Sequence, residues 1–167
     1  MKNKITVILF TYFFLTFLPA LDSNAAPAIN DQEALAGVQV TRSLFDINIT
    51  EPEKLLLYLT VIRKTHEDLI RQGQKPEFVI AFRGASVRLI TTETWSYAEE
   101  DERMLKESAM LLKEFKESGV TLEACSIATK LFKIDNQTIL PEVQVVGNTF
   151  VSLIGYQTKG YALIPIQ

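Results

Sequence analysis

The sequence predicts an α/β fold in which a mainly parallel sheet lies between helices. Short apolar runs rich in β-branched residues alternate along the chain with segments of helical periodicity, an order typical of strands joined by helical crossovers. Several of these runs are apolar at every position, as expected of strands that are covered on both faces. The chain has 167 residues and no internal repeat. We therefore expect one domain, at residues 39–167, with a single core.

Residues 1–38 precede the predicted domain and divide into two parts. Two lysines are followed by a long uncharged apolar stretch, and Ser23 and Ala25 are the small residues that a signal peptidase requires. The apolar stretch is shorter than the ~20 residues of a membrane span. We expect residues 1–25 to be a cleaved signal peptide and residues 26–38 a flexible N-terminus. The mature chain would then be exported, periplasmic or secreted, without stable membrane insertion.

A strand, a long helix and a second strand are predicted in the first half of the domain. The run 38–49 is β-rich and partly alternating, which indicates the first strand. A capping-box pattern at Thr50 to Glu53, with proline in the first turn, starts a helix whose apolar positions recur at helical spacing to about Arg71. The continuous apolar run 78–82 predicts the second strand. Residues 85–101 fit no single element, since part of them suits either a strand or a helix.

The second half of the domain continues the alternation. Apolar residues at helical spacing predict a helix from about Asp101 that stops at Gly119. A third strand follows at 120–125, and residues 126–132 have helical composition. Leu140-Pro141 is a break. A fourth strand, a helix and a last strand are then predicted at 143–146, 149–159 and 161–166.

Composition and motifs exclude several classes of function. The net charge of −3 does not favour nucleic acid or an anionic membrane as a partner. The sequence contains no GxGxxG, P-loop, GxSxG or HExxH motif. Its one histidine and one cysteine have no further ligands at metal spacing. We expect neither a metal nor an organic cofactor.

The carboxyl ends of the predicted strands hold the candidate site, because ligands bind at this edge of open parallel sheets. Cys125 ends the third strand and opens a helix, where free N–H groups and the helix dipole favour a thiolate. It is the candidate catalytic residue. The candidate binding residues at the same edge are Arg83, Gly84, Arg88, Ser126, Asn148 and Thr149.

An inert thiol is the alternative interpretation of Cys125. Free cysteine is among the residue types most often buried. The position of Cys125 at a strand end does not by itself distinguish a reactive thiol from an inert one. A single cysteine in an oxidising compartment forms no internal disulfide, which leaves a buried thiol, an intermolecular bridge or a reactive thiol. Gly84 is likewise better explained by a turn than by close approach of a ligand.

Two segments carry a family resemblance: residues 78–88, with Arg83-Gly84 and Val87-Arg88, and residues 122–125, which open a helix. Together with the order of elements over roughly residues 40–167, they resemble the DsrE/DsrF-like proteins. The resemblance implies a three-layer α/β/α fold, flavodoxin-like in appearance, with a five-stranded parallel sheet. It also implies homo-oligomers such as trimers or hexamers, and a cysteine, here Cys125, that accepts sulfane sulfur as a persulfide.

Two functions follow as hypotheses. In the first, Cys125 takes sulfur from a small sulfane-sulfur compound or a donor protein and passes it to an acceptor. In the second, the chain is a non-catalytic oligomeric binding or assembly module in which Cys125 is structural. A third and weaker hypothesis is a small anion or nucleotide site at Arg83, Gly84 and Asn148.

Overall fold

Five parallel strands form one sheet in the computed structural model, which describes residues 29–167. Their spatial order is β4-β3-β2-β1-β5. This architecture confirms the predicted α/β fold with a parallel sheet. The strands are β1 (Val40–Ile47), β2 (Lys75–Phe82), β3 (Thr121–Cys125), β4 (Gln144–Val146) and β5 (Ala162–Ile166).

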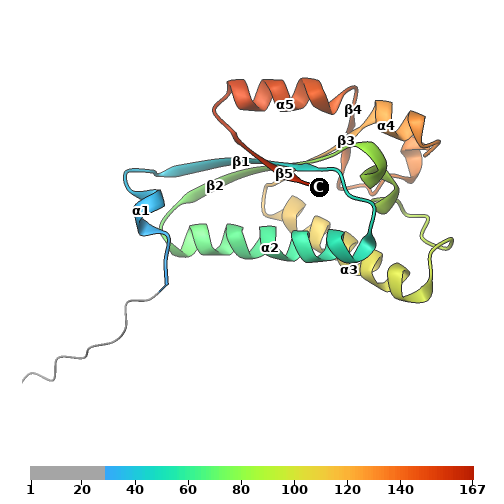
Figure 1. The fold of residues 1–167 in the computed structure, drawn as a ribbon, viewed down its shortest axis with the longest axis horizontal. Coiled ribbons are helices and arrows are strands. Elements are labelled where there is room, and N and C mark those ends of the chain that lie inside the picture. The colour runs from blue at the N-terminus through green and yellow to red at the C-terminus, as the bar shows by residue number, and fades with distance from the viewer. Residues whose placement is uncertain (1–28) are drawn as a thin grey trace, which may run out of the picture. The chain divides into compact units, whose positions relative to one another are not determined.

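Helices cover both faces of the sheet, which gives three layers (Figure 1). The long helices α2 (Pro52–Arg71) and α3 (Glu99–Glu117) lie together on one face. On the other face α5 (Thr149–Thr158) crosses from the β4 edge to the β5 edge, and α4 (Ser126–Leu131) directly follows β3. None of the helices within residues 29–167 combines the length and the apolar character that crossing a membrane requires.

The N-terminal part of the prediction is only partly covered by the described residues. The predicted signal peptide, residues 1–25, lies outside them. The N-terminus predicted at 26–38 is described from residue 29 and contains one helical turn, α1 (Gln32–Leu35).

Two local predictions differ from the structure, and a stretch that the sequence left open has a defined structure. Helix α2 begins at Pro52 with Glu51 as its N-cap and without a side-chain cap bond, so the capping box at Thr50 was wrong. The stretch after β2 is a 3-10 helix, η1 (Gly84–Leu89), followed by a single antiparallel bridge. Strand β2 starts at Lys75 and not at residue 78 as predicted. The strand can include Pro76 because β3 pairs with β2 only from Val79 onward, so no hydrogen bond to β3 is needed at the proline.

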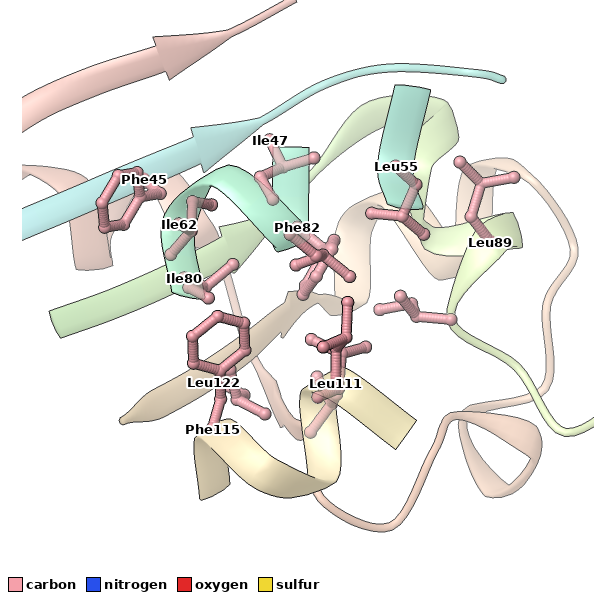
Figure 2. Close-up of a cluster of buried hydrophobic side chains, with 14 of the residues drawn as sticks. Phe45, Ile47, Leu55, Ile62, Ile80, Phe82, Leu89, Leu111, Phe115 and Leu122 are labelled. Carbon is pink, nitrogen blue, oxygen red and sulfur yellow. The ribbon is translucent and has the colours of Figure 1, made fainter. Parts of the chain in front are cut away.

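The main core lies between the sheet and the α2–α3 layer (Figure 2). Side chains alternate along each strand, so Ile80 and Phe82 point into this core, whereas Val79 and Ala81 pack beneath α5 with Leu153. A further short 3-10 helix, η2 (Asn136–Thr138), precedes β4. The same alternation decides which side chains of β1, β2 and β3 share the α5 face near Cys125.

Candidate functional site

Cys125 lies where the sequence predicts it, at the carboxyl end of β3. It is the N-cap residue of α4, its thiol is free, and its side chain is 6% exposed. It packs with Val87 of η1 and Ala128 of α4. This packing holds the thiol in a fixed place at the start of α4. The start of α5 is also nearby, because α5 begins with Thr149 just after the neighbouring strand β4.

These helix starts change the acidity of the thiol. Burial by itself raises the pKa of Cys125, but hydrogen bonds outweigh this effect and the pKa is lowered below its ordinary value. The bonds come from the backbone N–H and the hydroxyl of Thr149, and from the N–H groups of Ala128 and Ile127. Donors of this kind stabilise a thiolate, which is the nucleophilic form of cysteine.

A small pocket of about 180 Å³ opens at Cys125. Apolar side chains from α4 and α5 form much of its wall, and none of its described lining residues is a histidine or a carboxylate. The pocket brings together five of the seven predicted site residues, namely Cys125, Arg83, Gly84, Asn148 and Thr149. Its other lining residues are Ile127, Ala128, Leu131 and Phe150.

Arg83 is the cation of this pocket, and a buried carboxylate holds it. Its Nε lies 2.6 Å from Oδ1 of Asp46 and its Nη2 lies 2.9 Å from Oδ2. This hydrogen bonding is the main cause that raises the pKa of Arg83, with a smaller contribution from negative charge on Cys125. The guanidinium also lies over the ring of Phe150, 5.7 Å from its centroid.

Asn148 and Ser126 fix the two helix starts beside the pocket. Asn148 is the N-cap of α5, and its Oδ1 accepts a hydrogen bond of 2.9 Å from the N–H of Phe150. Ser126 does not line the pocket. Its hydroxyl donates a bond of 2.8 Å to the carbonyl of Gly147, which ties the start of α4 to the loop before α5.

Gly84 is required by the backbone. Its φ is +57°, and a Cβ placed there would lie 2.1 Å from Oδ1 of Asn48. Both facts favour glycine independently of any ligand. Gly84 also lines the pocket, so it permits close contact between η1, the loop after β1 and the site.

Arg88 lies apart from the Cys125 pocket. Its guanidinium lies over the ring of Phe132, 4.8 Å from the centroid. It lines a separate groove of about 440 Å³ with Trp95 and Tyr97, whose hydroxyl bonds to the Arg88 carbonyl. The side chains of η1 thus diverge, and the structure does not bring Arg88 to the thiol.

Two buried carboxylates near the site were missed by sequence reasoning. Asp46 and Glu123 flank Ala81 in one row across the α5 face of the sheet. Tyr156 donates a bond of 2.9 Å to Oε1 of Glu123, while Oε2 has no partner in the described structure. Burial and this carboxylate raise the pKa of Tyr156 to about 12. The available signal was a single acidic residue within each apolar strand, at a position that points toward the same face as Cys125.

The arrangement can perform nucleophilic chemistry at sulfur. It offers an acidified thiol, a fixed guanidinium and an apolar wall. Within residues 29–167, no group of three or more His, Cys, Asp or Glu side chains is placed to hold a metal ion.

The family of the chain follows from comparison with known sequences. The profile of the DsrE/DsrF-like family matches residues 23–166. The chain belongs to the DsrE/DsrF-like family. A protein of Aquifex aeolicus (strain VF5), described as uncharacterized, is 30% identical over 125 residues, which cover 74% of this chain and 55% of that protein. The chain therefore spans about half the length of this relative.

Solved structures show the same fold at low sequence identity. A protein of unknown function from Methanobacterium thermoautotrophicum, MTH1491, is similar with a TM-score of 0.59 and 20% identity over 77% of this chain and 99% of that one. The ychN protein from E. coli has a TM-score of 0.56 and 11% identity, with the same coverage. BT1422 from Bacteroides thetaiotaomicron has a TM-score of 0.51 and 21% identity over 74% and 95% of the two chains. These likenesses support the DsrE/DsrF-like fold.

Proposed function

We propose that this DsrE/DsrF-like protein is an exported sulfur carrier in which Cys125 accepts sulfane sulfur as a persulfide and passes it on. The observation that carries the proposal is the Cys125 thiol that lines an apolar pocket, where polar groups of Thr149, Ala128 and Ile127 lower the pKa of the thiol. Export rests on the sequence pattern of residues 1–25.

The transfer is balanced without an external oxidant or metal. The Cys125 thiolate attacks the outer sulfur of a donor persulfide, R–S–SH. A new bond forms between Sγ and that sulfur while the S–S bond of the donor breaks, and the donor leaves as the thiolate R–S⁻. An acceptor thiolate then attacks the outer sulfur on Cys125, takes it together with its proton, and regenerates the Cys125 thiolate.

The pocket contributes three effects to this step. The Thr149 hydroxyl and the N–H groups of both helix starts stabilise negative charge on Sγ. Arg83, fixed by Asp46, places positive charge near the reacting sulfurs. The side chains of Ile127, Leu131 and Phe150 form an apolar wall that suits neutral or weakly hydrated sulfur.

Intact-mass measurement tests the proposal directly. The purified protein is exposed to a low-molecular-weight persulfide, to polysulfide and to thiosulfate in separate reactions. We expect a mass gain of one sulfur atom that a thiol reductant reverses. Cys125→Ser is the matched control and should show no gain. If the wild-type protein gains no reversible sulfur from any donor, the carrier proposal fails.

The assembly-module alternative has one specific observation in its favour, the packing of Cys125 with Val87 and Ala128. It predicts that iodoacetamide alkylates Cys125 much more slowly in the native protein than in the denatured one. The anion-site alternative is weakened because Asp46 already binds Nε and Nη2 of Arg83. Calorimetric titration with phosphorylated ligands tests it, and no heat of binding is expected.

A further inference from the structure

Helix α5 brings Thr149 to Cys125, and the place of this helix depends on its contacts with the rest of the fold. The helix has 10 residues and includes Gly155. Isolated helices of this length are marginal in water, and a glycine in the interior lowers their stability further. Packing and hydrogen bonds must therefore hold α5 in place on its side of the sheet (Figure 1).

One side of α5 faces the sheet through three residues. Thr149, Leu153 and Tyr156 recur at the spacing of a single helix face. Thr149 is 1% exposed, Leu153 packs with Val79 and Ala81 of β2, and Tyr156 packs against the same cluster. Thr149 and Tyr156 thus mark the two ends of the face that α5 turns to the sheet.

A buried carboxylate holds the Tyr156 end of this face. The Tyr156 hydroxyl donates a hydrogen bond of 2.9 Å to Oε1 of Glu123, which is 6% exposed. The side-chain bonds of Gln157 and Thr158 stay within the helix, whereas the Tyr156 bond links α5 to β3. Because Oε2 of Glu123 has no partner within residues 29–167, the carboxylate depends on this bond.

Strand β3 therefore meets α5 at two points. Glu123 lies two residues before Cys125, and side chains at this spacing point to the same face of a strand. Cys125 contacts the Thr149 end of the helix, and Glu123 contacts the Tyr156 end. Loss of the second contact allows the helix to shift on the sheet, and such a shift also moves Thr149 away from the thiol.

We propose that Tyr156, bonded to Glu123, is a positioning residue that sets the start of α5 against Cys125. Burial and the carboxylate raise the pKa of Tyr156 to about 12, so its hydroxyl keeps its proton and remains a donor while the thiol titrates. This role goes beyond the proposed function, because it concerns the acidity of the thiol and holds equally if Cys125 carries no sulfur.

The pH profile of Cys125 alkylation by iodoacetamide in the purified protein tests this role. Tyr156→Phe removes the hydroxyl and keeps the ring contact with Tyr161. We expect the midpoint of the profile to move to higher pH, because the polar groups of Thr149 are no longer held against the thiol. Alkylation near neutral pH should slow about three- to tenfold.

Tyr97→Phe is the matched control. It makes the same chemical change at a hydroxyl that bonds to the Arg88 carbonyl, and neither residue lines the Cys125 pocket. The alkylation profile of this variant should coincide with that of the wild type. An equal shift in Tyr97→Phe would mean that general loosening of the fold, rather than the place of α5, controls the thiol.

Variants of Glu123 separate positioning from a direct effect of its charge. Glu123→Gln is the conservative variant, which keeps an acceptor oxygen for Tyr156 and should retain most of the wild-type acidity of the thiol. Glu123→Leu removes the acceptor and the negative charge together. Loss of positioning slows alkylation of Cys125, whereas loss of a nearby negative charge alone would speed it. We expect Glu123→Leu to slow alkylation, as Tyr156→Phe does.

A double variant shows whether Tyr156 acts through Thr149. Tyr156→Phe should slow alkylation much less in the Thr149→Val background, because part of the contact that it positions is already gone. Circular dichroism establishes that each variant is folded, and Glu123→Leu decides the question if Tyr156→Phe does not fold. An unchanged profile in Tyr156→Phe, faster alkylation in Glu123→Leu, or additive effects in the double variant would overturn the proposal. Intact-mass measurement of sulfur loading tests the carrier function separately, since its failure would leave the alkylation profiles unaffected.

Discussion

The α2–α3 side and the α4–α5 side of the sheet differ in how many charged side chains they present to water. The outer surface of α2 and α3 is charged and is crossed by exposed ion pairs, such as Arg103–Glu107 and Lys106–Glu102. The α4–α5 side has apolar side chains outside and charge inside, where Asp46 and Arg83 pair under cover. Charge that faces water contributes to solubility, whereas the charges of Asp46 and Arg83 bind each other under cover.

The candidate site lies on the α4–α5 side, whose helices are the shorter ones. The acidified thiol and the pocket both lie on the α4–α5 side. The larger layer supplies the core and hence most of the stability. Variants on the two sides should therefore differ in kind, and three matched pairs and one single variant test the contrast.

The largest effect is expected from opening the buried ion pair. Asp46→Ala leaves Arg83 without its partner in a site where Asp46 is buried, and removing one member of a buried pair costs about 3–5 kcal/mol in the free energy of unfolding. The control, Glu107→Ala on α3, breaks an exposed pair and should cost about 0.5 kcal/mol or less. Urea denaturation measures both. Equal losses would remove the proposed contrast between the two sides.

The next effect is expected at the backbone beside the pocket. Gly84→Ala forces an alanine into a positive φ and against the Asn48 side chain, which we expect to cost about 1–3 kcal/mol in the free energy of unfolding. Gly147→Ala is the control at the same site, because Gly147 has no atom within 4 Å of an added Cβ and no positive φ. Its thermal midpoint should stay near that of the wild type. If Gly84→Ala did not lower the free energy of unfolding, the Asn48 side chain would have to move away from the added Cβ at little cost.

A smaller effect is expected on the thiol. Thr149→Val removes a hydroxyl that lowers the pKa of Cys125, so this pKa should rise. A hydrogen bond to a charged group contributes about 1.5–3 kcal/mol, and alkylation near neutral pH should therefore slow roughly tenfold. The rate increases with pH and levels off above the pKa, so the wild-type midpoint should lie below those of a free cysteine and of the variant. Thr158→Val, at the far end of α5, should leave the profile unchanged.

The smallest effect is expected at the other arginine of η1. Arg88→Ala removes a partly exposed cation–π contact with Phe132, which contributes about 0.5–1 kcal/mol. The pH profile of Cys125 alkylation should not move, because Arg88 lies outside the pocket. A shift of that profile would show that the two arginines share one electrostatic site.

Local patterns in the sequence predicted most of the fold. Helical spacing of apolar residues predicted α2 and α3, since each buries one stripe against the sheet. Strand boundaries shifted by a few residues because pairing with a neighbour, rather than composition, decides where a strand begins. Residues 85–101 showed no decisive pattern, since a 3-10 helix is too short to impose a period.

The site was predicted in part, for a related reason. Strand ends placed Cys125, Arg83 and Thr149 together, because parallel strands share one carboxyl edge. Arg88 was expected with them, but the turn of η1 directs it to another groove. Asp46 was missed because its role depends on the register between β1 and β2, which places it near Arg83 and which sequence spacing alone does not determine.

The place of β5 in the sheet has a consequence for how the chain folds. β1 is the first described strand and β5 the last, yet they are neighbours, and the Asn48 N–H bonds to the carbonyl of Ile166. During synthesis the edge of β1 that pairs with β5 stays without a partner until nearly all of the described chain has been made. Such a long-range pairing closes late and slowly. We infer that α5 and β5 dock last, and that the wall of the Cys125 pocket is completed in that final step.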